Sequence, residues 1–445
     1  MKLKPSNYNL LINDKDEDYY LNTYTGSTLR LTKRASKDLL YIINKIEKYD
    51  DIGLEFQLIV ELLLEHGFVL PYESDELTLV FNTFNERRKN KSALSLLITP
   101  TLKCNMKCFY CYQDRNNQSN LNKHDISSIV SFAAEKLEQS NRLRVTWFGG
   151  EPLFDKGFLF ECSNALIELA KNRYIDYSAT IVSNAYLLDT ETLLNLVKHK
   201  VKNIQVTLDG SQVFHDKVRR HLNVATNKRE ASFEKIINNI NLASNYLDIT
   251  VRVNVSIINM TSIENLINEL AKANLQSKIK NIYFHPIYNY NTINSNSNYK
   301  PTEGTHLTIQ QFAKLEVEWL RQAYNKGFKI NFPLKSGCSA LQENSFIIES
   351  NGEVKKCNND IGKSGTAFTT IYTTELISKF NIDNWKNYHP ETITECRNCM
   401  FLPVCFSNCP HRNMNSAERK PDKCPSFKYN WREVLPFVLN QMSKD

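Results

Sequence analysis

The central part of the chain, from residue 94 to about 330, alternates between short apolar runs and longer amphipathic segments. Apolar and β-branched residues concentrate in six runs, at 94–101, 143–149, 177–184, 203–210, 249–257 and 280–288. Segments with apolar residues at helical spacing separate them, at 124–139, 158–172, 190–199, 232–246 and 262–274. This alternation predicts an α/β domain with a parallel sheet, open or closed. The ligand of such a domain lies at the carboxyl ends of the strands.

The first 90 residues carry a different pattern, which predicts a small module before the α/β domain. Two β-prone runs flank a Thr-Gly turn, and this predicts a hairpin over 19–32. Apolar residues at helical spacing then predict helices over 37–49 and 55–67. The order strand–strand–helix–helix is typical of a winged-helix-like α+β module. The polar and basic stretch 84–93 is expected to be a linker.

The regular alternation fades after about residue 331, where cysteines become frequent. Residues 331–430 are short of long apolar segments, and a cysteine-rich region of this kind usually needs metal for its stability. Residues 431–445 are expected to form a C-terminal helix or tail.

Composition and charge leave a soluble globular protein as the simplest interpretation. The net charge of +7 over 445 residues is modest, and a lysine-rich surface explains it better than an anionic partner does. The N-terminus has no apolar run of signal-peptide length, and no window approaches the roughly 18 apolar residues of a membrane-spanning helix. We therefore expect a cytoplasmic protein without a membrane partner.

The cysteines are clustered. Ten of the eleven lie in two blocks, at 104–111 and 338–424. Without an export signal, this distribution argues against a disulfide framework and favours metal binding or redox chemistry. The remaining one, Cys162, lies on the apolar face of a predicted helix and is expected to be a buried hydrophobic residue.

The first block, Cys104-x3-Cys108-x2-Cys111, directly follows the first predicted strand and so lies at the ligand edge of the sheet. A structural zinc site takes four protein ligands, and no fourth cysteine is near. A 4Fe–4S cluster held by three thiolates instead leaves one iron open for a small molecule. A zinc knuckle completed by a histidine is the alternative.

This block, with Tyr110 before its third cysteine, resembles the signature of the radical S-adenosylmethionine (SAM) enzymes. In that family the open iron binds the amine and carboxylate of SAM. One electron from the cluster cleaves SAM to a 5′-deoxyadenosyl radical, which abstracts a hydrogen from the substrate. The resemblance implies a partial (β/α)6 barrel for 94–330, a position beside the adenine for Tyr110, and an external one-electron donor such as flavodoxin or ferredoxin.

Two later segments resemble the family's SAM-binding segments. TWFGGEP (146–152) is similar to the GGEP segment: Gly149 and Gly150 let the backbone approach a ligand, and Glu151 accepts from the SAM amine. VSNAYLL (182–188) is similar to the TNG-x-LL segment and brings Asn184 to the site, with Ala185 in place of the family's glycine.

VTLDGSQVFHDKVRR (206–220) resembles the family's SLDG…HD-x-x-R segment. The resemblance implies that Thr207 hydrogen-bonds the ribose or carboxylate of SAM and that Arg219 pairs with its carboxylate. Asp209 ends a strand at the ligand edge and is a candidate general base.

Two further features of this region are open to more than one interpretation. His215 and Asp216 either act in the site directly or cap a helix. Arg252, with Asn254, is expected to face inward at the end of a later strand. A buried arginine needs an anionic partner, and this favours a position near SAM.

The second cysteine block resembles the SPASM domain that accompanies radical SAM enzymes acting on peptides and proteins. Cys338-x13-Gly352-x4-Cys357 is followed by Cys396-x2-Cys399-x5-Cys405-x3-Cys409 and then Cys424. The resemblance implies two auxiliary 4Fe–4S clusters, and so three clusters in all. Cys396, Cys399, Cys405 and Cys424 would hold the outer one. Cys338, Cys357 and Cys409 would hold the inner one, because Phe332 stands where some relatives have a fourth cysteine. A pair of zinc ribbons is the alternative.

Several functions fit these resemblances. The favoured one is a maturase that installs a crosslink (C–C, C–O or thioether) or a related oxidative modification in a ribosomal precursor peptide, with residues 1–90 as a leader-binding module. An anaerobic sulfatase-maturing (formylglycine-generating) enzyme is an alternative, although such enzymes usually carry the first cysteine block near the N-terminus and have a fully ligated inner cluster. A cofactor-pathway enzyme acting on a peptide is another.

A function of another class is an iron–sulfur redox sensor that binds nucleic acid through a winged helix. Only the basic stretch 84–93 favours it, so a nucleic-acid partner is not expected. For residues 1–90, a packing extension without a ligand is the simpler alternative.

Overall fold

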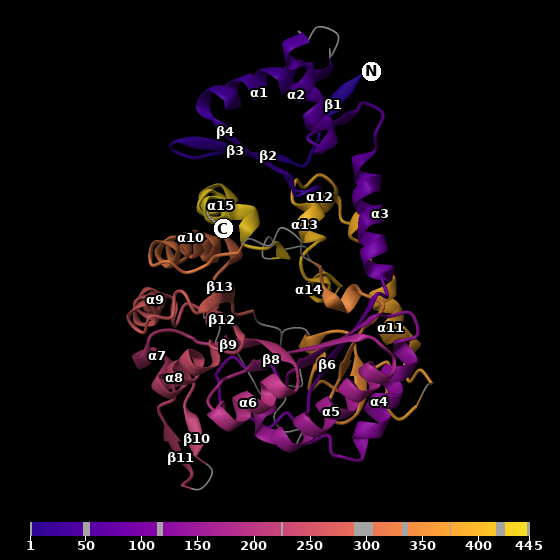
Figure 1. The fold of residues 1–445 in the computed structure, drawn as a ribbon, viewed down its shortest axis with the longest axis vertical. Helices are drawn as coiled ribbons and strands as arrows, with labels where there is room; N and C mark the ends of the chain where they lie inside the picture. Colours follow the sequence, from indigo (N-terminus) through magenta and orange to yellow (C-terminus); the bar gives the residue numbers. More distant parts are fainter. Residues whose placement is uncertain are drawn as a thin grey trace.

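A computed structural model describes residues 2–47, 54–113, 119–223, 226–288, 306–331, 337–373, 375–414 and 423–442 (Figure 1). The six strands predicted for the central domain are present and parallel. They are β6 (Ala93–Ile98), β7 (Arg142–Trp147), β8 (Asp176–Ser183), β9 (Val201–Thr207), β12 (Asp248–Val255) and β13 (Ile279–Pro286). They lie side by side in the order β6-β7-β8-β9-β12-β13, so the prediction of a partial (β/α)6 barrel is confirmed.

Helices cover the outer face of this sheet. Five of them lie in the segments predicted to be helical: α4 (Asp125–Lys136), α5 (Lys156–Asn172), α6 (Thr190–Lys198), α8 (Phe233–Ala243) and α9 (Ile263–Lys272). Two more, α7 (Gln212–Val218) and α10 (Ile309–Asn325), were not predicted. In α9 the buried residues Ile263, Leu266, Ile267 and Leu270 repeat at helical spacing and form one apolar stripe against the sheet. In the described parts of the chain, no helix has the length and hydropathy needed to cross a bilayer.

The cysteine-rich region continues the barrel sheet, which the sequence did not indicate. β14 (Ser345–Ile348) pairs parallel to β6, and β15 (Glu353–Lys355) and β16 (Thr369–Thr370) follow antiparallel. The resulting nine-stranded sheet runs from β13 to β16. Short helices complete the region: α11 (Lys379–Lys386), α12 (Thr394–Arg397), α13 (Leu402–Cys405) and α14 (Pro410–Met414). The C-terminal helix α15 (Phe427–Met442) packs against α10.

The N-terminal segment folds into a sheet with helices on one side. β2 (Asn9–Asn13), β3 (Glu17–Asn22) and β4 (Thr28–Thr32) form an antiparallel meander, which includes the predicted hairpin. α1 (Lys33–Lys45) and α2 (Leu54–Glu65) follow, and β1 (Leu3–Pro5) pairs with β5 (Val69–Pro71). The side chain of Thr32 accepts from the amide of Ala35 and begins α1 as an N-cap.

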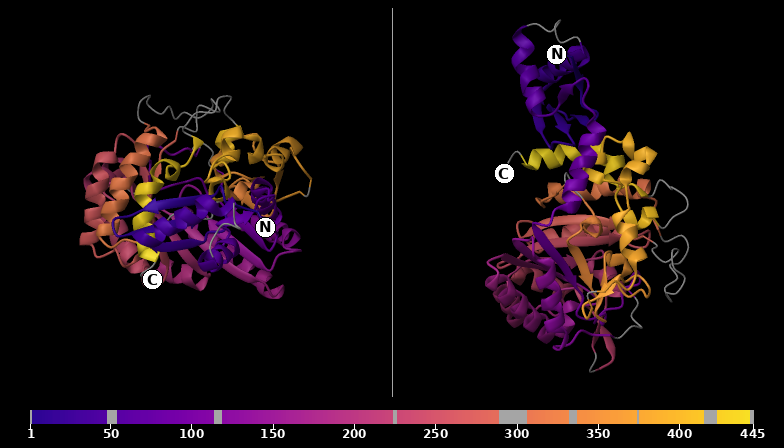
Figure 2. Two further views of the ribbon diagram at one scale, coloured as in Figure 1. Left: turned by 90° about the horizontal axis from the view of Figure 1, so that it is seen from above. Right: turned by 90° about the vertical axis from the view of Figure 1, so that its right-hand side faces the viewer.

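Both faces of this small sheet are covered. Tyr20 and Leu11 pack towards α1 and α2. Tyr19 and Leu21 belong to a second apolar cluster. This cluster also contains Trp431 and Leu435 of α15 and Phe401, which directly precedes α13. Because alternate residues of a strand point to opposite faces, the sheet joins its own helices to the cysteine-rich region. The N-terminal module lies above that region, beside α15 and α13 (Figures 1 and 2).

The prediction of a linker over 84–93 is wrong for most of that stretch. Residues up to Lys89 belong to the helix α3 (Glu76–Lys89), which runs from the N-terminal module down beside the cysteine-rich region (Figure 1). Val80, Phe84 and Arg88 are buried at four-residue spacing along one face of α3. The polar composition concealed this face, because one of its buried members is an arginine.

Arg88 is buried by contact with the cysteine-rich region. Its guanidinium donates to the carbonyls of Tyr388 and Trp385, at 2.8 Å each, and to that of Lys386. A buried guanidinium needs such acceptors. The bonds tie the end of α3 to the end of α11.

We predict that R88A lowers the free energy of unfolding by roughly 2–4 kcal/mol, because it leaves three backbone carbonyls without their charged donor. Chemical denaturation followed by circular dichroism measures this change. The exposed neighbour is the control: K89A should change the free energy by less than about 0.5 kcal/mol. Equal effects of the two substitutions would contradict the docking role of Arg88.

Candidate active site

The first cysteine block forms a loop after β6, at the carboxyl edge of the sheet. Cys104, Cys108 and Cys111 are thiols outside disulfide bonds, and all three are partly buried. The amide of Met106 donates to the sulfur of Cys104 at 3.4 Å, and the amide of Cys111 donates to the carbonyl of Cys108 at 3.3 Å. N–H groups that point at a thiolate are a feature of iron–sulfur sites.

Gly149 and Gly150 press the next loop against the cysteine loop. A Cβ on Gly149 would lie 2.5 Å from the carbonyl oxygen of Thr101, and one on Gly150 would lie 2.2 Å from that of Lys103. The amide of Gly150 donates to Thr101 at 3.0 Å. The close approach that requires glycine here is therefore to the chain itself, whereas the sequence suggested an approach to a ligand.

Glu151 is buried at the centre of this edge, with 1% of its surface exposed. Oε1 accepts from the amide of Leu153 (3.0 Å) and the hydroxyl of Ser183 (2.8 Å), and Oε2 accepts from the amide of Asn184 (2.8 Å). Burial raises the pKa of Glu151, and these hydrogen bonds oppose the rise. A carboxylate can accept about four hydrogen bonds, so one position remains for a donor such as an ammonium.

Asn184 joins the end of β8 to the cysteine loop. Its amide nitrogen donates to Asn105 Oδ1 at 2.7 Å and lies 3.9 Å from the sulfur of Cys104. Ala185, where the related segments have glycine, adopts the left-handed conformation at φ 59°. Its amide donates to Ser183, and its carbonyl accepts from Asn239. The alanine therefore preserves the turn that holds Asn184.

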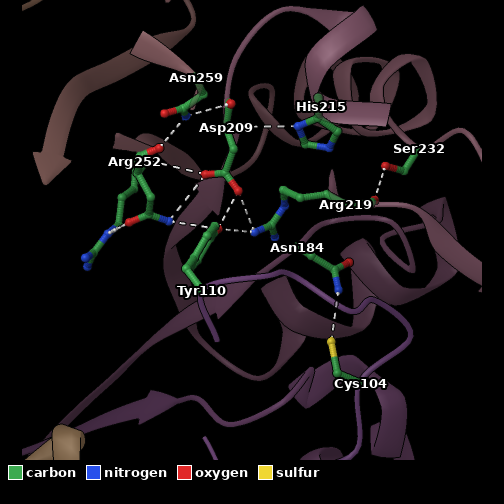
Figure 3. Close-up of polar contacts among 10 residues, drawn as sticks. Cys104, Tyr110, Asn184, Asp209, His215, Arg219, Ser232, Arg252 and Asn259 are labelled. Atoms are coloured by element: carbon green, nitrogen blue, oxygen red, sulfur yellow. Dashed lines mark hydrogen bonds and ion pairs between the residues drawn. The ribbon is translucent and has the colours of Figure 1, made fainter. Parts of the chain in front are cut away.

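Tyr110, Asp209 and Arg219 form a buried network (Figure 3). Arg219 Nη1 donates to Asp209 Oδ2 at 3.1 Å and to the hydroxyl of Tyr110 at 2.5 Å, and that hydroxyl donates to Asp209. Arg219 and Asp209 are 5% and 0% exposed. Burial alone would lower the pKa of Arg219. The charges of Cys108, Tyr110 and Asp209 outweigh this effect, so the pKa lies well above its usual value.

Residues at the end of β12 complete the network around Asp209. Asn254 Nδ2 donates to the Tyr110 hydroxyl at 3.0 Å, and Asn259 Nδ2 donates to the backbone carbonyl of Asp209 at 2.9 Å. The Asp209 carboxylate thus faces an arginine, a phenol and an amide of the protein. These contacts favour a positioning role for Asp209 over the role of a general base.

The pair His215 and Asp216 lies within α7, and its contacts are with the protein. His215 is fully buried, and its Nδ1 lies 3.4 Å from the amide of Asp209. Burial and the charge of Arg219 hold its pKa well below the usual value. Asp216 Oδ1 accepts from the amides of Ser232 and Phe233, at 2.7 and 2.9 Å, and so caps the start of α8. Of the two interpretations, helix capping fits Asp216.

Thr207 and Arg252 are opposite each other in the pairing of β9 and β12, at the carboxyl edge. Arg252 Nε donates to Asn254 Oδ1 at 2.9 Å. Burial raises the pKa of Tyr112, and the charge of Arg252 opposes the rise. Burial holds the pKa of His285 well below its usual value, and the charge of Arg252 adds to this effect. The guanidinium of Arg252 lies 6.0 Å from the centre of the Tyr283 ring.

One contribution to the site was not visible in the sequence. The hairpin of β10 (His221–Asn223) and β11 (Lys228–Glu230) supports the cysteine loop. The amide of Leu222 donates to the carbonyl of Asn105 at 2.7 Å, and His221 stacks on Tyr186 with ring centroids 3.9 Å apart. Each strand is only three residues long, so the sequence is too short to show the alternation of apolar and polar residues that would predict a strand.

The second cysteine block forms two separate groups. Four of its cysteines line one cavity of about 850 Å³: Cys396, Cys399, Cys405 and Cys424. Burial raises the pKa of Cys396 to about 11, and the charges of Cys399 and Cys424 contribute. Lys428 Nζ lies 3.5 Å from the sulfur of Cys424. These are the four residues expected at the outer cluster.

The other group consists of Cys338, Cys357 and Cys409. Burial raises the pKa of Cys357 well above its usual value, and the charges of Asp360, Cys338 and Cys409 add to the rise. The three thiols therefore lie close enough to interact, as expected for the inner cluster. Phe332 is outside the described residues.

Burial raises the pKa of the Tyr112 hydroxyl, and the charges of Cys111, from the first cysteine block, and Cys357, from the second, add to the rise. Cys162 belongs to neither block: this thiol is fully buried in α5, and burial raises its pKa to about 12.

The arrangement after β6 fits a three-thiolate iron–sulfur cluster with bound SAM. Three thiols outside disulfide bonds lie on the loop next to the one that carries the Glu151 carboxylate, which can accept a further donor. Within the described residues, the buried Nε of Arg219 has no hydrogen-bond partner, and a carboxylate is its natural ligand.

Comparison with known proteins agrees with this geometry. Residues 98–274 match the Radical SAM superfamily. The chain is 24% identical over 369 residues to a cysteine-type anaerobic sulfatase-maturating enzyme of Clostridium novyi, covering 76% of this chain and 94% of that enzyme. The structure of anSMEcpe with bound AdoMet and Cp18Cys peptide superposes over 79% of this chain and all of that one, with a TM-score of 0.59 and 18% identity. Streptococcus suis SuiB bound to the precursor peptide SuiA superposes over 95% of this chain and 98% of that one, with a TM-score of 0.51 and 15% identity.

Residues 98–274, which contain the three-cysteine loop and most of the barrel, thus form a domain of the Radical SAM superfamily. The cysteine-rich region extends the barrel sheet, and the fold that results resembles the folds of anSMEcpe and SuiB.

We predict that D209N weakens SAM binding at least tenfold, because it leaves the charge of Arg219 buried without its counter-charge. Calorimetric titration of SAM into the reconstituted enzyme measures the affinity. D248N is the control, since Asp248 pairs with Lys280 on the exposed opposite end of the sheet; its affinity should match the parent. An unchanged affinity in D209N would contradict the role of the pair.

Proposed function

We propose that this protein is a peptide maturase, which uses radical SAM chemistry to install a crosslink or a related oxidative modification in a ribosomal precursor peptide. The observation that carries the proposal is the N-terminal module, a small sheet with an exposed edge strand packed on the SPASM-type region. The proposal includes three 4Fe–4S clusters, one that binds SAM and two auxiliary ones.

The module offers an edge for an extended peptide. β4 is an outer strand of the meander, and among the described residues it pairs only with β3. Thr28 and Thr32 are exposed, whereas Leu29 and Leu31 pack on the module's apolar cluster. A leader peptide that added a strand here would gain main-chain hydrogen bonds and alternate side-chain contacts. The opposite outer strand, β2, instead packs beside α15.

The extent of the structural likeness supports a precursor peptide as substrate. The likeness to anSMEcpe covers 79% of the chain, and the likeness to SuiB bound to its precursor peptide covers 95%. The additional coverage means that a fold like that of the N-terminal module also occurs in a protein bound to a precursor peptide. Both structures contain a bound peptide.

The chain's own residues would hold the cofactors and exclude water. Cys104, Cys108 and Cys111 would bind the first cluster, and Glu151 and Arg219 would bind the amine and carboxylate of SAM. When bound, these cofactors supply a radical that removes one hydrogen atom from the peptide and, at an auxiliary cluster, an acceptor for the remaining electron.

Sulfatase maturation is the second candidate, because the sequence similarity to the Clostridium novyi enzyme extends over 94% of that enzyme. In that case the product would be a formylglycine residue, and the N-terminal module would serve only as a packing extension.

We predict that co-expression with small peptides encoded beside the gene yields a peptide that has lost two hydrogens for each crosslink. The reason is that one hydrogen leaves as an atom and the other as a proton and an electron. High-resolution mass spectrometry with fragmentation detects the loss and its position.

The variant C104A/C108A/C111A is the control and should abolish the product. A product formed by this variant would exclude the radical mechanism. Formylglycine in a sulfatase peptide, without modification of the neighbouring peptides, would favour the second candidate.

We also predict that the leader part of the substrate slows amide exchange in residues 28–32 at least tenfold, because an added strand protects the edge amides of β4. Hydrogen–deuterium exchange with mass spectrometry measures this, and residues 9–13 of β2 serve as the internal reference. Equal protection of both strands, or of neither, would contradict binding at the β4 edge.

A further inference from the structure

Three buried groups converge beside the inner cysteines. Ligand atoms of Cys357, Asp360 and His411 all lie within 4.8 Å of one another, close enough to bind one metal centre. The three residues are 5%, 7% and 5% exposed. Cys357 and Asp360 come from the turn after β15, and His411 comes from α14. The sequence analysis assigned only the cysteine to a metal.

Asp360 lies next to the inner thiol of Cys357, since a carboxylate oxygen and the sulfur are within 4.8 Å of each other. A second inner cysteine, Cys409, directly precedes α14, the helix that carries His411. The carboxylate therefore lies beside the inner cysteines, and carboxylates are ligands for iron in proteins.

The backbone around Asp360 is fixed from several sides. Its amide donates to the carbonyl of Cys357 at 3.0 Å, and its own carbonyl accepts from Lys355 Nζ at 3.1 Å and from the amide of Lys363 at 3.0 Å. Lys355 is fully buried and forms an ion pair with Glu349. A side chain on so constrained a turn can serve as a ligand without much loss of conformational entropy.

His411 holds the carboxylate itself. Its Nε2 lies 3.2 Å from Oδ1 of Asp360, in a buried contact. A carboxylate has two oxygens, so Oδ1 can accept from the imidazole while the other oxygen bonds a metal. Hydrogen bonds of this kind orient the ligands of many metal sites.

We propose that Asp360 is the fourth ligand of the inner auxiliary cluster and that His411 is the residue that positions its carboxylate. This inference rests on the part of the proposed function that places a cluster on Cys338, Cys357 and Cys409. It gives the inner cluster a complete set of protein ligands without a fourth cysteine, so that neither the substrate nor a diffusible molecule occupies that iron.

The test uses the full-length chain with C104A/C108A/C111A, reconstituted without oxygen, so that only the auxiliary clusters form. We expect about eight irons per chain, from two four-iron clusters. In this chain, cyanide should leave the electron paramagnetic resonance spectrum of the reduced protein unchanged, because no iron has an open position.

Adding D360A should keep most of the iron and produce a spectrum that responds to cyanide. D360C should restore the insensitivity to cyanide, with a signal shifted from that of the parent. H411Q should perturb the signal less than D360A does. D383N is the matched control and should match the parent, since Asp383 is a partly exposed aspartate on α11 of the same region.

Other outcomes would overturn the inference. A cyanide response in the parent chain shows an iron that is already open, and an identical spectrum in D360A shows that the carboxylate is no ligand. Loss of a single metal ion in D360A, with both clusters intact, shows a mononuclear site. Only four irons in the parent overturn both the inference and the proposed cluster count. A failed peptide assay with these spectra as expected overturns the proposed substrate alone.

Discussion

The buried ion pair of Asp209 and Arg219 is the interaction on which the SAM site depends. Two opposite charges are buried where the cysteine loop meets the ends of β9 and β12, and the Tyr110 hydroxyl lies between them. A buried charge is tolerated only with its partner in place, so the pair holds these three segments in a single arrangement. The positive charge of Arg219 remains directed at the cysteine loop, where a negative cluster and a carboxylate would bind.

A second constraint, the continuity of the sheet, sets the distance between the cysteine blocks. β14 pairs with β6, the strand that leads into the first cysteine loop, and Cys357 follows β15 one strand further on. Main-chain pairing thus fixes Cys357 relative to the first block. The N-terminal module is tied to the same body through Arg88 and the apolar face of β3. A peptide held at β4 would therefore be presented to a rigid site.

Much of the fold could be predicted from the sequence, because its main signals are local. Buried and more exposed residues alternate along most of each barrel strand, and covering helices such as α9 have an apolar stripe, so the pattern alone identifies them. The cysteine and GGEP segments were also recognisable, since their spacing reflects the turn in which they lie. The elements that were missed depend on distant partners. The end of α3 is helical because the cysteine-rich region accepts the hydrogen bonds of Arg88, and no local pattern contains that information. Asp360 and His411 are 51 residues apart, and only the fold brings them together.

The first cysteine block and the inner cysteine group each have three cysteines, one fewer than the four ligands of a 4Fe–4S cluster. The residues that surround these two sites differ. Beside the first block stand a guanidinium nitrogen without a described partner and a carboxylate with room for a donor, both complementary to a zwitterionic small molecule. Beside the inner block stand an aspartate and a histidine already bonded to each other and fixed by a rigid turn. The residues around the first block are therefore arranged to bind a small molecule, whereas those around the inner group can complete the site without one. In the proposed maturase, the inner cluster would therefore exchange electrons without binding the peptide.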